Sequence, residues 1–333
     1  MNKVLFRVDD GPGIGSGHLM RCLAIAEEVN KSGGSVYLST TRPSSLHKSW
    51  ARLACPILVR DRVIGSSDDL VITSEVIDEV GADWFVIDGY GFETTWIDEI
   101  ALKTRTLYVD DCGSRDPAVD ILLNHNPGSE YRYAGVYKRS KQVLLGPSWF
   151  LIRQEFRLSE NIKRDYNHIL VTLGGEDPDN RVLDIIRGLN CDGRTFSATI
   201  VSSQDNEGYR VSESICNNNL ESFCLYKGPI QLSRFLRKAS VVICGGGVTA
   251  IEAICSGAAP VVMPIANNQS ANVKYLGQIG AVLVASGTDS EVSRQSIDLL
   301  HDETARNLIV RNGSNLVDRN GAHRVVTQMK GNV

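Results

Sequence analysis

FRVDDGPGIGSGHLMRCLAIA, residues 6–26, carries the pattern that decides the fold. It begins as the end of an apolar strand, continues as a loop with glycine at every second position from 11 to 17, and ends as a helix. Glycine tolerates φ > 0 and has no Cβ, so such a loop lets a ligand approach the backbone closely. From His18 onward apolar residues recur at three- and four-residue spacing, which is typical of a helix packed on a sheet.

His18 stands where this loop becomes the helix. The free N–H groups in the first turn of a helix favour an anion or a polarised oxygen. A histidine side chain can take up or release a proton near neutral pH. We therefore predict that the reaction takes place around His18. The alternative interpretation is structural, an N-cap histidine beside a glycine-rich loop.

Length and composition indicate a globular protein of two domains. The 333 residues exceed what one core usually supports, and 42% hydrophobic with 22% charged residues is ordinary for globular proteins. The net charge of −4 argues against a broad nucleic-acid-binding surface. The chain opens without a signal-peptide pattern, and no apolar run approaches the roughly 20 residues of a membrane span. The eight cysteines contain no C-x-x-C pair, so we expect reduced thiols in a cytoplasmic protein.

Strand-like and helix-like segments alternate along the chain, which predicts parallel sheets covered by helices on both faces. We expect a Rossmann-like domain at residues 1–150, a crossing segment at 151–166 and a second Rossmann-like domain at 167–333. The final helix, residues 321–329, could pack on either domain. The expected strands are 4–9, 35–40, 84–88, 106–110, a short strand at the start of 120–135, 143–147, the start of 167–180, 195–201, 222–227, 240–246 and 259–265.

Ligands of such sheets bind at the carboxyl ends of the strands. This rule places six polar residues on the same rim as His18, although each could be a loop residue without chemistry: Asp9, Asp10, Asp88, Tyr90, Asp110 and Asp111. Consecutive residues at a strand end point to opposite sides, so each aspartate pair offers one metal ligand at best. We therefore expect no metal. Among the other histidines, only His125 is expected near this rim.

A second glycine-rich turn, residues 245–247, follows a strand and opens a helix whose first polar residue is Thr249. Its backbone N–H groups and the Thr249 hydroxyl would suit a pyrophosphate. The spacing fits neither a P-loop nor a G-x-G-x-x-G pattern, which disfavours an NTPase and a dinucleotide-dependent oxidoreductase. Glu252 would accept hydroxyl donors such as a ribose diol, or is simply solvated. Four amide side chains beyond it are helix caps or ligand contacts: Asn267, Asn268, Gln269 and Asn272.

The segments GGVTAIEAICSGAAP (246–260) and ANNQSAN (266–272) resemble the nucleotide-sugar site of GT-B-fold proteins related to the peptidoglycan GlcNAc transferase. The segment 6–26, followed in order by VIDGYGF, VDD, DILLNHN, LLGPSWFLIRQEF and VTLGGEDPDN, resembles the UDP-sugar hydrolases of pseudaminic acid biosynthesis. This resemblance covers nearly the full length. It implies a GT-B-like α/β fold of two doubly wound Rossmann-like domains with the site in the cleft between them.

The same resemblance implies hydrolysis of UDP-2,4-diacetamido-2,4,6-trideoxy-β-L-altropyranose to UDP and the free sugar, without a metal or cofactor and with His18 as general base. It carries ligand contacts onto Gly175, Asn180, Val248, Thr249 and Glu252. The substrate-binding residues that we expect are Asp9, Gly15, Gly17, Arg21, Asp88, Tyr90, Asn124, Asn180, Gln269 and Asn272. The nucleotide-binding residues that we expect are Gly174, Gly175, Gly246, Gly247, Val248, Thr249 and Glu252.

UDP leaves more readily than the alkoxide of an ordinary glycoside, so one base can replace the usual pair of carboxylates. We expect His18 to draw a proton from water on the face opposite UDP, giving C1–O cleavage with inversion. The expected partner is the UDP-sugar alone, without nucleic acid or membrane insertion, and the protein is expected to be a monomer or weak dimer. The alternative is a GT-B glycosyltransferase that uses a UDP-amino sugar donor. A non-catalytic nucleotide-sugar binding protein is the third possibility.

Overall fold

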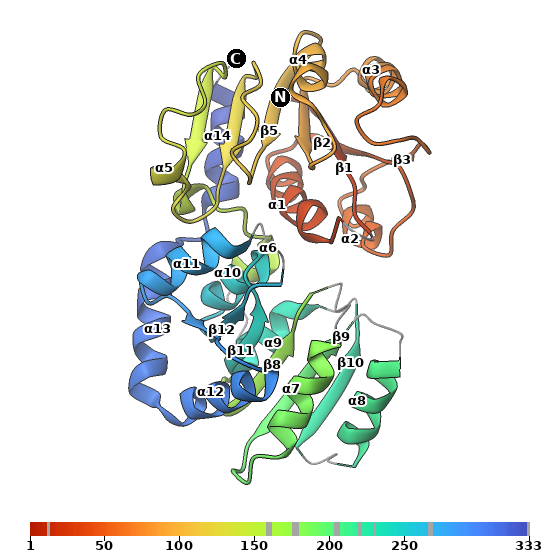
Figure 1. Cartoon of the computed structure of the whole chain (residues 1–333). Helices are drawn as coiled ribbons and strands as arrows, with labels where there is room; N and C mark the ends of the chain where they lie inside the picture. Colours follow the sequence, from red (N-terminus) through yellow and green to blue (C-terminus); the bar gives the residue numbers. More distant parts are fainter. Residues whose placement is uncertain are drawn as a thin grey trace. The chain divides into compact units, whose positions relative to one another are not determined.

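The computed structural model describes residues 1–11, 14–157, 162–174, 180–202, 207–218, 222–228, 231–265 and 269–331. The chain divides into two compact units (Figure 1): unit 1 comprises residues 1–154 and 319–333, and unit 2 comprises residues 155–318. The first boundary lies within the crossing segment expected at 151–166. The second domain was expected to continue to residue 333, but residues 319–333 belong to unit 1.

Unit 1 is built on a seven-stranded sheet whose strand pairs are all parallel. Its order is β3-β2-β1-β4-β5-β6-β7. The strands are β1 (Lys3–Val8), β2 (Ser35–Thr40), β3 (Ile57–Val59), β4 (Trp84–Asp88), β5 (Arg105–Val109), β6 (Ile121–Asn124) and β7 (Gln142–Leu145). The helical elements are α1 (Gly17–Lys31), α2 (His47–Ala51), α3 (Ser67–Val80), α4 (Thr94–Ala101), α5 (Ser129–Arg132), η1 (Pro147–Trp149) and α14 (Gly321–Gly331). The short helix α6 (Gln154–Arg157) spans the boundary between the units.

Unit 2 repeats the plan with a six-stranded parallel sheet of order β10-β9-β8-β11-β12-β13. Its strands are β8 (Asp165–Thr172), β9 (Ser197–Ser202), β10 (Phe223–Lys227), β11 (Ala239–Gly245), β12 (Ala259–Met263) and β13 (Leu283–Val284). Its helices are α7 (Arg181–Asn190), α8 (Glu207–Asn217), α9 (Leu232–Lys238), α10 (Val248–Cys255), α11 (Ser270–Gln278), α12 (Asp289–His301) and α13 (Glu303–Leu316). The prediction of two doubly wound parallel sheets is confirmed.

The strand order reverses once in each sheet, between β1 and β4 in unit 1 and between β8 and β11 in unit 2. The loops that follow the two strands at such a reversal diverge to opposite faces and leave a crevice at the carboxyl edge. In unit 1, Val8 pairs with Asp88, so the glycine-rich loop after β1 starts beside the last residue of β4. The fold therefore places the two predicted motifs, residues 6–26 and 245–247, at the two reversal points.

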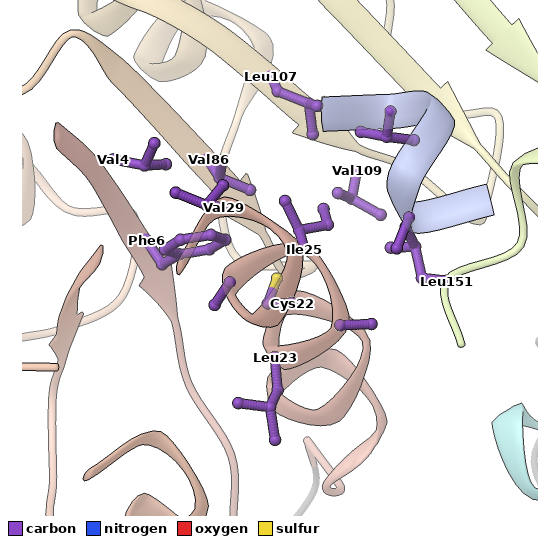
Figure 2. Packing of buried hydrophobic residues seen from close by; sticks show 14 of the residues in the cluster. Val4, Phe6, Cys22, Leu23, Ile25, Val29, Val86, Leu107, Val109 and Leu151 are labelled. Atoms are coloured by element: carbon purple, nitrogen blue, oxygen red, sulfur yellow. The ribbon is translucent and has the colours of Figure 1, made fainter. Parts of the chain in front are cut away.

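Burial of both sheet faces explains the apolar strands. One face of the unit 1 sheet packs against α1, where Cys22 and Ile25 belong to the same core cluster as Phe6, Val86 and Val109 (Figure 2). The opposite face packs against α3 and α4 through a second cluster of buried residues. Strands covered on both sides read as nearly continuous hydrophobic runs, which is why β2 and β4 were predicted with their observed bounds. The edge strands β3 and β13 were missed because they have three and two residues.

The C-terminal helix α14 is a component of unit 1 although α13 before it lies in unit 2 (Figure 1). Ala322, Val325, Val326 and Met329 join the same core cluster as α1. Gly321 starts the helix against the chain that follows η1: a Cβ at Gly321 would lie 2.2 Å from the carbonyl oxygen of Phe150. The last helix, which the sequence left free to pack on either domain, thus completes the α1 face of unit 1.

His125 also contacts residues 150–151, the segment on which α14 begins. Its Nδ1 accepts a hydrogen bond from the Leu151 backbone N–H at 3.1 Å, and its ring centroid lies 4.3 Å from that of Phe150. Burial lowers the pKa of His125 to about 3, and the nearby positive charge of Arg21 acts in the same direction. His125 is therefore a neutral structural residue that fixes residues 150–151 to the end of β6.

Across the residues that the structure describes, no helix combines the length and the apolar character that crossing a bilayer requires.

Replacement of Gly321 by alanine tests the docking of α14. The added Cβ would meet backbone atoms of residues 149 and 150, which cannot move aside as a flexible side chain can. We expect the free energy of unfolding, measured by urea denaturation, to fall by about 1–3 kcal/mol. Gly331→Ala in the same helix is the matched control, because no atom lies within 4 Å of the added Cβ. Equal stability of the two variants would contradict the docking.

Replacement of His125 by glutamine should flatten the acid side of the stability profile. The unfolded chain binds a proton at His125 as the pH falls below about 6.5, whereas the folded chain does not until about pH 3. Stability from this residue is therefore complete above pH 6.5 and declines between pH 6.5 and pH 3. Between pH 7.5 and pH 5.0 wild type should lose about 2 kcal/mol more than His125→Gln in urea titrations. Parallel losses in the two proteins would show that His125 is not held neutral.

Candidate active site

His18 is the second residue of α1, and its side chain is buried at the carboxyl edge of the unit 1 sheet. The N-cap position is occupied by Ser16, so the alternative interpretation of His18 as the capping residue is wrong. Gly15 has φ +76, a left-handed conformation that favours glycine, and no atom of the described residues lies within 4 Å of a Cβ added at Gly15 or Gly17. At these two positions the described part of the chain leaves space beside the backbone.

The Asp88 carboxylate fixes the His18 ring. Asp88 ends β4 and has 1% of its surface exposed, and its Oδ1 lies 2.6 Å from Nδ1 of His18. At that distance from a carboxylate oxygen we assign the ring proton to Nδ1, which donates to Asp88 and leaves the lone pair on Nε2. Burial alone would raise the pKa of Asp88, but the charges of Arg21 and His18 outweigh it and hold the pKa well below its usual range. Asp88 is therefore a permanent carboxylate behind the ring.

Arg21 lies one helical turn beyond His18 and pairs with the same carboxylate. Its Nε lies 2.5 Å from Oδ2 of Asp88, and its Nη2 lies 2.6 Å from Oδ1. The third nitrogen, Nη1, donates to Asp111 at 2.9 Å. Every nitrogen of this buried guanidinium has a partner within the protein, so Arg21 supports the site from behind His18. The expected contact of Arg21 with substrate stays a prediction.

Tyr90 closes the outer side of the cluster. Its ring stands nearly perpendicular to the His18 ring, with centroids 4.7 Å apart and an interplanar angle of 84°. Its hydroxyl donates to Asp111 at 2.9 Å. Tyr90 is 38% exposed whereas His18 is 5% exposed, so Tyr90 presents a surface that a ligand approaching His18 would meet.

Asp9 and Asn124 were predicted to bind substrate, but both side chains are buried and occupied. Oδ1 of Asp9 accepts three hydrogen bonds from Thr40 and Thr41, and its Oδ2 pairs with Arg7. Asn124 is fully buried, and its amide nitrogen donates to the Tyr137 hydroxyl at 3.3 Å. Both groups therefore stabilise the loops at the strand ends, and their expected contacts with substrate stay predictions.

The paired aspartates diverge, as strand geometry predicts. Asp110 accepts hydrogen bonds from the Tyr137 hydroxyl and from the backbone N–H groups of Cys112 and Gly113. Asp111, which the sequence placed on the rim but not among the binding residues, is the one that reaches Arg21 and Tyr90. Within the described ranges no three His, Cys, Asp or Glu side chains are grouped so that they could hold a metal ion.

In unit 2, the turn after β11 packs tightly on the start of α11. A Cβ at Gly246 would lie 2.2 Å from Val273 Cγ2, so glycine is required there by the protein's own packing. Oε1 of Gln269 accepts the Gly246 N–H at 2.9 Å and the Ile265 N–H at 3.2 Å. The acceptor of Gln269 is thus occupied, and only its amide nitrogen is left to meet a ligand.

The first turn of α10 remains suited to an anion. Its N-cap, Gly247, offers no side-chain cap, and no acidic residue stands in the first turn. Val248 and Thr249 are partly exposed. Uncapped N–H groups at a helix start attract phosphate oxygens.

The remaining predicted residues of unit 2 lie on or next to β8, α7, α10 and α11. Glu252 is 3% exposed, so its carboxylate lies inside unit 2. Asn180 occupies the N-cap position of α7 in the left-handed conformation (φ 54) without a side-chain cap. Gly174 has φ +91, and no atom in the described part of the chain lies within 4 Å of its Cβ position. Asn272 is half-buried on α11. Gly175, Asp179, Asn267 and Asn268 lie outside the described residues.

No family model matches the chain. A Campylobacter jejuni protein named UDP-2,4-diacetamido-2,4,6-trideoxy-beta-L-altropyranose hydrolase is 25% identical over 287 residues, covering 84% of this chain and 97% of that protein. Spore coat polysaccharide biosynthesis protein SpsG of Bacillus subtilis is 22% identical over 337 residues, covering 95% and 94%. An uncharacterized protein of Methanocaldococcus jannaschii is 24% identical over 278 residues, or 78% of this chain, and the match spans only 55% of that protein's length.

Solved structures resemble the whole chain. The S. aureus MnaA–UDP complex has a TM-score of 0.72 at 13% identity, covering 99% of this chain and 96% of that one. Phytolacca americana UGT2, complexed with UDP-2-fluoro-glucose and pterostilbene, has a TM-score of 0.71 at 11% identity, covering 100% and 99%. Acinetobacter baumannii MurG has a TM-score of 0.66 at 16% identity, covering 99% of each chain. The chain therefore has the predicted GT-B-like fold of two Rossmann-like domains.

Proposed function

We propose that this protein hydrolyses a UDP-activated 2,4-diacetamido-2,4,6-trideoxy sugar of the L-altro form to UDP and the free sugar. The observation that carries the proposal is the His18 ring, which is held at Nδ1 by Asp88 at the reversal of strand order. That contact turns Nε2 away from Asp88 as the nitrogen proposed to act as the base. The name of the Campylobacter jejuni relative supports the choice of substrate.

In the proposed reaction, Nε2 of His18 takes a proton from water as the water oxygen attacks C1 of the sugar. The C1–O bond breaks with inversion, and its electron pair leaves on the phosphate oxygen of UDP. Asp88 stabilises the imidazolium that forms, because its carboxylate accepts the Nδ1 proton. A general base of this kind contributes about 10²–10⁴-fold to the rate.

Unit 2 is proposed to bind UDP. The N–H groups of the first turn of α10 and the Thr249 hydroxyl would donate to the diphosphate and offset the negative charge that grows on the leaving group. Because these donors stabilise a good leaving group, the proposal needs neither a general acid nor a metal.

Release of UDP, followed by phosphorus NMR in oxygen-18 water with EDTA, tests the proposed function. We expect wild type to release UDP from the altro-configured UDP-sugar with the label in the free sugar, and His18→Gln to be about 10²–10⁴-fold slower. His301→Gln, an exposed histidine of α12, is the control and should keep full activity. Label in UDP would contradict C1–O cleavage, and an unaffected His18→Gln variant would contradict the role of the base.

The second candidate is glycosyl transfer, in which an acceptor hydroxyl replaces water and gives its proton to the same Nε2. The Phytolacca structure, solved with a UDP-sugar analogue and pterostilbene, has the same fold. It shows that this fold can hold a second molecule together with a UDP-sugar, which supports the alternative. The same assay separates the two reactions: UDP that appears only after an acceptor alcohol is added would establish transfer and exclude hydrolysis.

Replacement of Thr249 by valine tests the proposed nucleotide site. Valine keeps the shape but removes the hydroxyl, so one hydrogen bond to a charged diphosphate is lost. We expect the Kd for UDP, measured by titration calorimetry, to rise about 10-fold. Thr304→Val, at an exposed position of α13, is the matched control and should leave the Kd unchanged. An unchanged Kd in Thr249→Val would show that the Thr249 hydroxyl does not contact UDP.

A further inference from the structure

Asp111 belongs to the cluster around His18 although it does not touch the His18 ring. It contacts Arg21 and Tyr90, which do. Its Oδ2 accepts from Arg21 Nη1 at 2.9 Å and from the Tyr90 hydroxyl at 2.9 Å. Its carboxylate is 12% exposed, so the ion pair with the nearly buried Arg21 is only weakly screened by water. Asp111 therefore ties a residue of α1 to a residue after β4.

Without Asp111 the arrangement behind His18 would oppose a proton on the ring. Nδ1 of His18 and Nη2 of Arg21 share one acceptor, Oδ1 of Asp88, and the two nitrogens are 2.9 Å apart. A guanidinium so close to an imidazolium is a like-charge contact in a buried place, which disfavours the charged ring. The bidentate pairing of Arg21 also neutralises Asp88, so Asp88 alone cannot balance both cations.

The second carboxylate, Asp111, supplies the negative charge that balances a proton on His18. Asp88 and Asp111 together carry two negative charges against the single positive charge of Arg21, which leaves one negative charge for the imidazolium. Four neighbouring groups do not supply it: Tyr90 and Cys112 donate to Asp111, Cys22 donates to Asp88, and His125 is neutral. Arg115, which donates to the Tyr90 carbonyl at 2.8 Å, is a cation and lies 3.6 Å from Glu93. Asp111 thus provides the charge that a protonated His18 needs.

We propose that Asp111 is a positioning residue of this site, which draws charge from Arg21 and fixes Tyr90 so that His18 can accept a proton on Nε2. The proposal rests on the proposed function in one respect, that His18 is the base. Asp111 touches neither the reacting atoms nor the His18 ring, so its removal acts on the protonation of the ring and on the turnover rate rather than on ligand affinity.

The test compares wild type with Asp111→Asn, which removes the charge and keeps the shape, and with Asp111→Glu, which keeps the charge. Nitrogen-15 NMR of the imidazole rings, with His18 assigned from the His18→Gln variant, follows ring protonation in the resting protein. Because a negative charge is removed, we expect the pH midpoint of His18 protonation to fall by about one unit in Asp111→Asn. In Asp111→Glu we expect most of the wild-type midpoint to be restored.

Kinetics give the second readout. In Asp111→Asn the acid limb of the kcat–pH profile should move to lower pH by the same interval, and the plateau of kcat should fall about 10-fold because a weaker base transfers the proton less well. KM should change less than 3-fold. Asp98→Asn, which breaks the surface pair with Arg139 at 2.6 Å, is the matched control and should leave midpoint, kcat and KM unchanged.

The outcomes separate this inference from the proposed function. An unshifted His18 midpoint in Asp111→Asn, in a wild type that hydrolyses the UDP-sugar, overturns the role of Asp111 and leaves the function standing. A shifted midpoint in a wild type that releases no UDP supports Asp111 and removes the function. A KM effect without a midpoint shift would make Asp111 a substrate contact instead. If Asp111→Asn does not fold, Asp111→Gln against Asp111→Glu repeats the charge comparison with a longer side chain.

Discussion

A buried carboxylate, Asp88, sets the constraint on which the candidate site depends. An ionised group with 1% of its surface exposed must be paired within the protein, and its partners here are His18 and Arg21. Both come from one helix turn, so α1 must begin where it does and must face the end of β4. The reversal of strand order between β1 and β4 brings these ends together. The parallel sheet is thus what allows a fixed, oriented histidine at the start of α1.

Much of the fold could be predicted from the sequence because both sheets are buried on two faces. The bounds of β2 and β4 coincide with their apolar runs, whereas β3 and β13 are too short to show a period. The docking of α14 could not be predicted. The helix has an apolar stripe, which indicates that one side of it is buried: Ala322, Val325, Val326 and Met329. Such a stripe does not identify the domain on which the helix packs. That choice depends on the close approach of Gly321 to residues 149–150.

The sequence placed the candidate site at the strand ends, but it could not show which hydrogen-bond partners each side chain has there. Strand ends identified the rim, and His18, Asp88 and Tyr90 do meet there. Asp9 and Asn124 lie on the same rim, but their side chains form hydrogen bonds within the protein. The partners of these hydrogen bonds are far away in the sequence, so the sequence did not reveal them. One signal was present: Arg7 and Asp9 are two residues apart in an extended chain and therefore share a side. The link from Arg21 to Asp111 spans 90 positions and depends on the loop after β5, which no local pattern specifies.

The return of the chain to unit 1 has a consequence for how this protein is made. On the ribosome, residues 1–154 emerge first, but the helix that covers the α1 face is synthesised only after all of residues 155–318. At ordinary elongation rates that interval is roughly 10–30 s. Through this time the nascent unit 1 lacks one of its helices, and the apolar residues around Leu151 and α1 that α14 will cover lack their partner. Unit 2 can finish folding before unit 1, although its sequence comes second.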